Sequence, residues 1–164
     1  MSQIKVEDIM THDPFIISPE KTVETAAKLM KEINCGILPV GTHPEKIVGI
    51  ITDRDIMLRV TAEGKDASQT LIQDVMTKEV YGCDAEADIE SAAKQMREYN
   101  VCRLVVTREN KRITGIVTLG ELLRNDGIVQ VSDKVLHELL GLRKKYHAKK
   151  APKQLQDKPG ASFS

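Results

Sequence analysis

Residues 49–55 read Gly-Ile-Ile-Thr-Asp-Arg-Asp, and residues 115–121 read Gly-Ile-Val-Thr-Leu-Gly-Glu. In both stretches an apolar run leads into a threonine that is followed three residues later by a carboxylate. A threonine and an acidic residue at this spacing are typical of a capping box at the start of a helix. Each stretch is therefore predicted to be a strand that turns into a helix, and its recurrence 66 residues later indicates an internal repeat.

The repeat extends well beyond these two stretches. The same offset aligns the two halves of the chain without a gap, and the identical pairs include Asp8 and Asp74, Met10 and Met76, Thr11 and Thr77, Ala26 and Ala92, Met30 and Met96, Asn34 and Asn100, and Val40 and Val106. Repetition at a fixed period indicates that each copy is one structural unit and that neighbouring copies complete each other's core.

Each copy is predicted to have the element order βαββα. Short apolar runs bounded by turn-forming residues favour strands, and two such runs joined by a short loop favour a hairpin. The hairpin loops are expected at residues 41–45 and 108–111. The predicted strands are residues 15–18, 37–40 and 47–52 in the first copy and residues 81–84, 104–106 and 113–118 in the second.

Two helices per copy are predicted from capping and periodicity. Thr22 and Asp88 are suitable N-cap residues for the first helix, and a second helix is expected after Thr52 or Thr118. Apolar residues at positions i, i+3, i+4 and i+7 indicate a buried face on the first helix. This face contains Val23, Ala26, Ala27, Met30 and Ile33 in the first copy and Ile89, Ala92, Ala93, Met96 and Tyr99 in the second.

The predicted fold class is α/β (α+β), with two pseudo-symmetric βαββα units packed sheet to sheet and a C-terminal helix. A unit of this size buries too little apolar surface to be stable alone, so we expect the two copies to share a core around a pseudo-twofold axis. The expected organisation is a first unit at residues 5–63, a second at 71–127, a helix at 132–149 and a disordered basic tail at 150–164.

Composition favours a soluble globular protein. Hydrophobic residues make up 41% of the chain, and 24 Lys and Arg balance 24 Asp and Glu, so no net charge attracts DNA. No apolar run reaches the roughly 20 residues that a membrane-spanning helix needs. The three cysteines form no CxxC pattern, and no pair of histidines or cysteines has the spacing of metal ligands. We therefore expect a cytoplasmic protein without membrane insertion, DNA partner or metal.

The threonine and carboxylate pair has two interpretations. As an isolated motif it is more often a structural capping box. In the functional interpretation, the free N–H groups at the helix start bind an anion. The two oxygens of Asp55 match the vicinal hydroxyls of a ribose, and Arg54 pairs with a phosphate. Together these groups suit a nucleotide.

The ordered set of motifs resembles the CBS domain family, named after cystathionine β-synthase, in its usual paired form. The resemblance rests on residues 8–11, 36–40 and 49–55 and on their counterparts 74–77, 103–106 and 115–121. It implies that each ligand cleft combines the Thr-x-x-Asp of one copy with the Met-Thr segment and second strand of the other. The first cleft would then contain Thr52, Arg54, Asp55, Thr77, Tyr81, Val101, Cys102 and Arg103, and the second Thr11, Phe15, Cys35, Gly36, Ile37, Thr118 and Glu121.

The second copy departs from the family pattern. Glu121 replaces the usual aspartate, Gly120 stands where the first copy has Arg54, and Leu119 replaces Asp53. We therefore expect the second cleft to be the weaker ligand site. The aligned aromatic residues Phe15 and Tyr81 either stack on a base or pack in the core, and we favour packing. Cys35 and Cys102 are interpreted as small buried residues rather than as a thiol switch.

The resemblance implies a regulatory module rather than an enzyme. Such a module binds an adenosine nucleotide (AMP, ADP, ATP or a compound similar to S-adenosylmethionine), needs no cofactor, and signals to a separate enzyme or transporter. The family also implies a homodimer that forms through helical faces. The alternative is a protein-interaction or oligomerisation module whose nucleotide clefts are vestigial.

Overall fold

The computed structural model describes residues 4–108 and 112–124. The first copy contains η1 (Val6–Asp8), β1 (Thr11–His12), α1 (Val23–Glu32), β2 (Ile37–His43), β3 (Lys46–Thr52), α2 (Asp53–Ile56) and the π-helical segment η2 (Met57–Thr61). The second contains α3 (Ile72–Val75), β4 (Gly82–Asp84), α4 (Ile89–Tyr99), β5 (Arg103–Arg108), β6 (Arg112–Thr118) and α5 (Leu119–Arg124). The helix expected at 132–149 and the tail expected at 150–164 lie outside the described residues.

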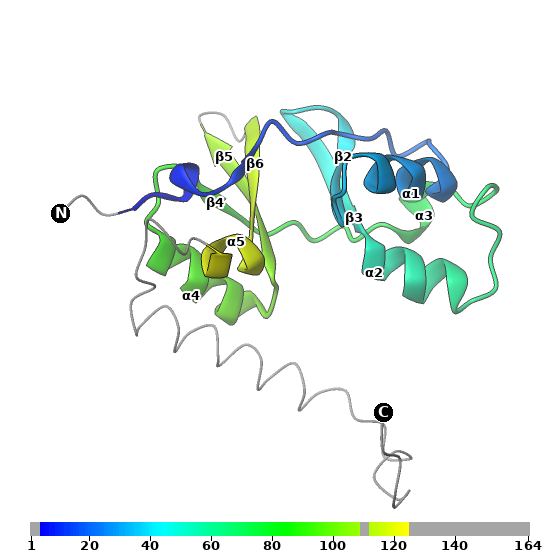
Figure 1. The fold of residues 1–164 in the computed structure, drawn as a ribbon. Coiled ribbons are helices and arrows are strands. Elements are labelled where there is room, and N and C mark those ends of the chain that lie inside the picture. The colour runs from blue at the N-terminus through cyan, green and yellow to red at the C-terminus, as the bar shows by residue number, and fades with distance from the viewer. Residues whose placement is uncertain (1–3, 109–111, 125–164) are drawn as a thin grey trace, which may run out of the picture.

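The two hairpins stand next to each other at the centre of the molecule. Helices α1, α2 and α3 are grouped beside β2 and β3, and α4 and α5 are grouped beside β5 and β6 (Figure 1). The strands of each hairpin are antiparallel, and β4 runs parallel to β5. The predicted α/β class with two pseudo-symmetric units is confirmed.

Each copy gives its first segment to the sheet of the other copy. Strand β1 pairs with β6, which makes a four-stranded sheet in the order β1-β6-β5-β4. The equivalent segment of the second copy forms a single antiparallel bridge between Thr77 and Ile50. Likewise a single parallel bridge between Ile17 and Val40 is the counterpart of the β4–β5 pairing. The strand expected at 15–18 is therefore reduced to one bridge, whereas the one expected at 81–84 forms β4.

The exchanged segments are anchored by apolar side chains. Val6 and Met10 are buried in the core of the second copy, and Ile72 and Val75 are buried in the core of the first. These residues lie on or next to η1 and α3, two short helical turns that the sequence pattern did not predict. A run of only three or four helical residues is too short to show a periodic apolar face.

Gly49 and Gly115 allow these segments to approach the sheets closely. A Cβ atom at Gly49 would lie 2.8 Å from the carbonyl oxygen of Thr77, and one at Gly115 would lie 2.9 Å from the carbonyl oxygen of Thr11. Real Cβ atoms do not come this close to backbone oxygens. The glycines at equivalent positions of the two hairpins thus make room for equivalent exchanged segments.

The expected single shared core is replaced by two helix–sheet cores, one in each copy. Leu38 and Val40 face the first core, and Leu104 and Val106 face the second. Side chains alternate between the two faces of a strand, so the intervening residues point the other way. Among these, Ile37, Val105 and Ile116 are buried without belonging to either core, which places them between the two sheets.

Helix capping follows the prediction in both copies. The Thr22 hydroxyl accepts a hydrogen bond from the Thr25 N–H at 3.3 Å, and the Asp88 carboxylate accepts one from the Ser91 N–H at 2.7 Å. The predicted apolar faces are mostly buried, but Ala27 is exposed and Tyr99 is 43% exposed. None of the helices in the described part of the chain has the length and apolar content needed to span a lipid bilayer.

The first hairpin loop is shorter than predicted. Strand β2 continues to His43 because a bulge at Gly41 lets the strands resume pairing between His43 and Lys46. Glycine suits this bulge because a Cβ atom at Gly41 would lie 2.9 Å from the Ile47 side chain. Residues 41–43 of the predicted loop therefore belong to β2, and only residues 44 and 45 connect the two strands. The second predicted loop, at 108–111, lies largely outside the described residues.

Candidate functional site

The turn from β3 into α2 is the predicted capping box. The Thr52 hydroxyl accepts a hydrogen bond from the Asp55 N–H at 3.1 Å, and Asp55 Oδ2 accepts one from the Thr52 N–H at 3.0 Å. The Asp55 side chain is buried at the start of the helix, and the residue is only 8% exposed. The prediction that this motif is a capping box is therefore confirmed for the first turn.

Asp55 also contacts the segment that leads into the second copy. The Thr77 hydroxyl donates a hydrogen bond to Asp55 Oδ1 at 3.0 Å. The backbone fixes this contact, because Thr77 and Ile50 exchange two hydrogen bonds of 2.8 and 2.9 Å. Two of the predicted first-cleft residues, from different copies, therefore meet at one carboxylate.

Arg59 completes the environment of Asp55 and was not predicted. Its guanidinium lies 3.4 Å from Asp55 Oδ1 and donates a hydrogen bond to the Val75 carbonyl at 2.7 Å. The spacing of four residues between Asp55 and Arg59 on a helix is the signal that sequence reasoning missed. Arg59 thereby joins the start of the second helix to the exchanged segment.

The turn from β6 into α5 repeats this arrangement. Glu121 Oε2 accepts a hydrogen bond from the Thr118 N–H at 2.6 Å, and the Thr118 hydroxyl accepts one from the Glu121 N–H at 3.2 Å. The Thr11 hydroxyl donates to Glu121 Oε1. The predicted second-cleft residues Thr11, Thr118 and Glu121 therefore meet as their counterparts do.

The first turn carries an ion pair between the two copies. Arg103, at the start of β5, places its guanidinium 3.8 Å from the Asp53 carboxylate. The equivalent positions of the second turn are Ile37 and Leu119, which have no charge. Arg103 thus reaches the turn that sequence reasoning assigned to it, although its partner there is Asp53. Arg54 donates its backbone N–H to the same carboxylate at 2.8 Å.

The predicted aromatic residues have different environments. Tyr81 stacks on Tyr99 with ring centroids 4.4 Å apart and packs against the core of the second copy, as the packing interpretation expects. The nearby Glu79 carboxylate raises the pKa of the Tyr81 hydroxyl, which donates to Glu79 at 3.3 Å. Phe15 is 57% exposed, so the packing interpretation is wrong for this residue.

Gly36 and Cys102 each accept a backbone hydrogen bond from the strand–helix turn of their own copy. The Gly36 carbonyl accepts from the Asp53 N–H at 3.0 Å, and the Cys102 carbonyl accepts from the Leu119 N–H at 2.9 Å. Ile37 is buried, and Val101 is half-buried against the second core.

The three cysteines of the chain are free thiols. Cys35 is half-buried and donates to the Ile37 carbonyl at 3.1 Å. Cys102 is exposed, so its interpretation as a buried residue is wrong, because it lies in the turn before β5 rather than on a covered face. Burial raises the pKa of the Cys83 thiol to about 11.

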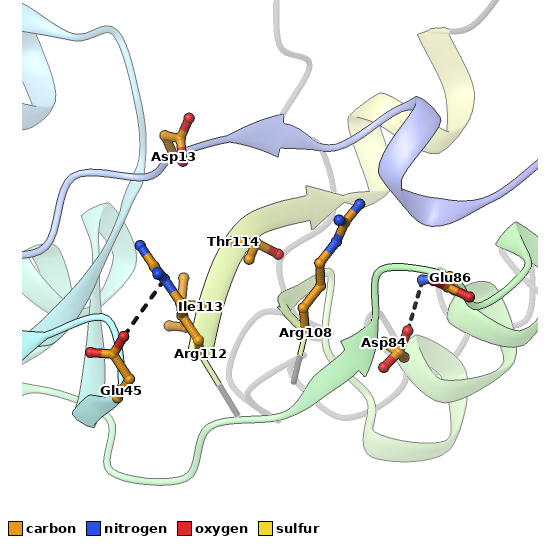
Figure 2. A pocket seen from close by; sticks show the side chains of 8 residues that line it. All are labelled: Asp13, Glu45, Asp84, Glu86, Arg108, Arg112, Ile113 and Thr114. Atoms are coloured by element: carbon orange, nitrogen blue, oxygen red, sulfur yellow. Dashed lines mark hydrogen bonds and ion pairs between the residues drawn. The ribbon is translucent and has the colours of Figure 1, made fainter. Parts of the chain in front are cut away.

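A hollow of about 670 Å³ lies at the hairpin ends of β5 and β6, away from both turns (Figure 2). Its lining residues are Asp13, Glu45, Asp84, Glu86, Arg108, Arg112, Ile113 and Thr114, none of which was predicted as a site residue. The Arg112 guanidinium lies 3.6 Å from the Glu45 carboxylate, which joins the two hairpins. Among residues 4–108 and 112–124, no group of three or more His, Cys, Asp or Glu is arranged to hold a metal ion.

The chain is similar to a curated bacterial protein and to solved structures. The CBS-domain-containing protein YhcV of Bacillus subtilis is 38% identical over 120 residues, which cover 73% of this chain and 84% of that protein. A crystal structure of Hypoxic Response Protein I with two coordinated zinc ions matches with a TM-score of 0.64 and 30% identity, covering 74% of this chain and 98% of the other.

A structure with bound adenosine compounds is also similar. The CBS domain pair of protein MJ0100, in complex with 5′-methylthioadenosine and S-adenosyl-L-methionine, matches with a TM-score of 0.66 and 28% identity. The match covers 74% of this chain and 94% of that pair. The family profile described as the CBS domain matches residues 6–62 and 72–127. The chain therefore belongs to the CBS domain family, as a protein with two CBS domains in tandem.

Proposed function

We propose that the chain is a regulatory module that binds an adenosine nucleotide between its two CBS domains and signals to a separate protein. The observation that carries this proposal is the meeting of both copies at Asp55, where the Thr77 hydroxyl donates to the carboxylate at 3.0 Å. A ligand that contacts this carboxylate touches both copies at once. Its binding can therefore bias how the copies are held together.

Each first-cleft residue has a proposed role. Asp55 binds the ribose hydroxyls, and the Thr52 hydroxyl, which accepts the Asp55 N–H, donates its own proton to the phosphate. Arg54 and Arg103 supply positive charge for the phosphate. The base lies against the opposite copy, along a surface formed by Thr77, Tyr81, Val101, Cys102 and Arg103.

The comparison with the MJ0100 pair supports an adenosine ligand. That pair is in complex with 5′-methylthioadenosine and S-adenosyl-L-methionine. In this chain Arg103 approaches the first turn, which favours a ligand that carries a phosphate. The second cleft, formed by Thr11, Phe15, Cys35, Gly36, Ile37, Thr118 and Glu121, has Gly120 and Ile37 where the first has Arg54 and Arg103, and we propose that it binds more weakly.

Titration calorimetry with a panel of AMP, ADP, ATP, S-adenosylmethionine and adenosine tests the proposal. Inosine and guanosine nucleotides are the matched controls for the base. We expect saturable binding of at least one adenosine compound and a higher melting temperature in its presence, because a ligand that binds only the native state stabilises it. Absence of binding by the whole panel at millimolar concentration would contradict the proposal.

One observation favours the alternative, an interaction module with vestigial clefts. Both oxygens of Asp55 already accept internal hydrogen bonds, from the Thr52 N–H and the Thr77 hydroxyl. A ribose has to share these oxygens or displace Thr77. If the panel does not bind, the two copies hold each other together through these contacts and the protein acts through its surface alone.

Regulation without catalysis predicts that a bound nucleotide is recovered unchanged. The nucleotide is incubated with pure protein and analysed by chromatography, with protein denatured beforehand as the control. Product that accumulates in proportion to the folded protein through successive purification steps would contradict a purely regulatory role.

A further inference from the structure

Asp53 and Arg103 form an ion pair whose two members come from different copies. Arg103 Nη2 lies 3.8 Å from Asp53 Oδ1, and the same oxygen accepts a hydrogen bond of 2.8 Å from the Arg54 N–H. The side chain of Arg103 is 34% exposed and that of Asp53 is 64% exposed. The backbone of the turn therefore holds the carboxylate in place, and the guanidinium approaches it from the other copy.

Gly36 provides the space in which the two charges meet. A Cβ atom at this position would lie 2.7 Å from Asp53 Oδ2 and 3.4 Å from Arg103 Nη2. The Gly36 carbonyl also accepts the Asp53 N–H at 3.0 Å. The ion pair therefore lies beside the backbone hydrogen bond that joins the start of α2 to the residue before β2.

We propose that Asp53 is a specificity-determining residue that restrains Arg103 and so sets the charge that a ligand needs in order to bind the first cleft. This inference rests on the proposed function and adds to it the control of ligand charge. An exposed ion pair at this distance is weak, whereas a phosphate offers an arginine shorter and stronger charge-assisted hydrogen bonds. A phosphate therefore displaces Asp53 from Arg103, and an uncharged nucleoside does not.

The second turn lacks this control. Leu119 stands at the position of Asp53 and Ile37 at the position of Arg103, so neither the restraint nor the cation is present. The charge of the ligand should accordingly matter in the first cleft and much less in the second. The two clefts should therefore differ in ligand preference: the first favours a ligand that carries a phosphate, and the second does not discriminate by charge.

Titration calorimetry of AMP and adenosine on the full chain tests the inference with four proteins: the wild type, Asp53→Asn, Arg103→Met and the double variant. Asp53→Asn should raise the affinity for AMP about two- to fivefold, the range expected when a weak exposed ion pair no longer competes. Its affinity for adenosine should not change. Arg103→Met should weaken AMP by a larger factor than adenosine, because only AMP carries the phosphate that the guanidinium binds.

The double variant separates restraint from simple repulsion. If Asp53 acts by holding Arg103, Asp53→Asn should gain much less AMP affinity when Arg103 is already methionine. An equal gain in both backgrounds would mean that Asp53 merely repels phosphate, and the inference would be overturned. Glu20→Gln, at an exposed turn before α1, removes one negative charge elsewhere and controls for the net charge of the chain.

Gly36→Ala tests the same contact without a change of charge. The new Cβ atom would lie 2.7 Å from Asp53 Oδ2, so this flexible side chain has to turn, and its 3.8 Å contact with Arg103 through Oδ1 does not keep its present geometry. The affinity of the first cleft for AMP should rise as it does in Asp53→Asn, and a fall would overturn the inference. If neither AMP nor adenosine binds the wild type, the proposed function fails as well. If both bind and Asp53→Asn leaves their ratio unchanged, only this inference fails.

Discussion

Asp55 and Glu121 occupy equivalent positions, yet their carboxylates have different surroundings. Asp55 has the Arg59 guanidinium at 3.4 Å in addition to its threonine partners. Glu121 is one methylene longer and accepts from the equivalent groups, the Thr118 N–H and the Thr11 hydroxyl. The first turn also has Arg103 close by, whereas the second has Ile37 at that position. A phosphate therefore meets more positive charge at the first turn.

These differences predict unequal clefts, and the one that contains Asp55 should bind more tightly. A charge-assisted contact contributes about 1.5–3 kcal/mol, so the dissociation constants should differ by more than tenfold, which needs only about 1.4 kcal/mol. In titration calorimetry, Asp55→Ala should remove the tighter binding event and Glu121→Ala should leave it nearly unchanged.

Asp55→Asn controls for the loss of the capping box. Asparagine retains an oxygen that can accept the Thr52 N–H, so this variant should stay folded while it loses the negative charge. A Glu121→Ala variant that loses the tighter event, together with an Asp55→Ala variant that keeps it, would show that the second cleft is the working one.

At the scale of single elements, the two N-caps offer a matched pair with different pH dependence. The hydrogen bond from the Ser91 N–H lowers the pKa of Asp88, whereas Thr22 does not ionise near neutral pH. A carboxyl group with a lowered pKa in the folded state adds stability above its unfolded pKa of about 3.9. This stability is lost as the pH falls through the folded value.

Asp88→Ala and Thr22→Ala should each lower the free energy of unfolding by about 1 kcal/mol at pH 7. At pH 3, which is below the unfolded pKa, the cost of Asp88→Ala should be smaller, because the advantage of the charged side chain in the folded state declines as the pH falls from the unfolded pKa towards the folded one. The cost of Thr22→Ala should be the same at both pH values. Urea unfolding followed by circular dichroism measures all four differences. An Asp88→Ala cost that grows as the pH falls would contradict the prediction.

Elements were predictable from sequence where the pattern is local. The caps at Thr22 and Asp88 and the hairpin strands follow from neighbouring residues, and the structure has them at the expected places. The exchange of Val6 and Ile72 between the cores was not predictable, because no local pattern says which copy a segment joins.

The candidate site divides in the same way. The Thr-x-x-Asp spacing identified the two turns, and the resemblance to the family paired each turn with a threonine of the other copy. The Asp53–Arg103 ion pair was missed because it joins side chains of different copies. The contact of Arg59 with Asp55 was missed although the spacing of four residues on a helix is a local signal for it.

At the scale of the whole molecule, one helical surface of the first copy remains uncovered by the described residues. Met57 is 58% exposed and Leu58 is 47% exposed, both at the start of η2. Ala27 on α1 is exposed as well, whereas its counterpart Ala93 is fully buried in the second core. Large apolar side chains that stand together on a helical surface favour a protein–protein contact.

We therefore expect a homodimer that buries Met57 and Leu58. Light scattering after size exclusion at micromolar concentration should give about twice the 18.3 kDa mass of the chain. Leu58→Glu should shift the protein toward the monomer, because a carboxylate in an apolar interface pays a desolvation cost without a partner. Val48→Glu is the matched control, since Val48 is 49% exposed but lies on β3 rather than on the helical surface. A wild-type monomer, or equal dissociation of both variants, would contradict the expected interface.

Removal of residues 132–164 tests which of two partners covers this surface, a second copy or the predicted helix at 132–149. If that helix covers the surface within one chain, the truncated protein should form a dimer that the full chain does not form.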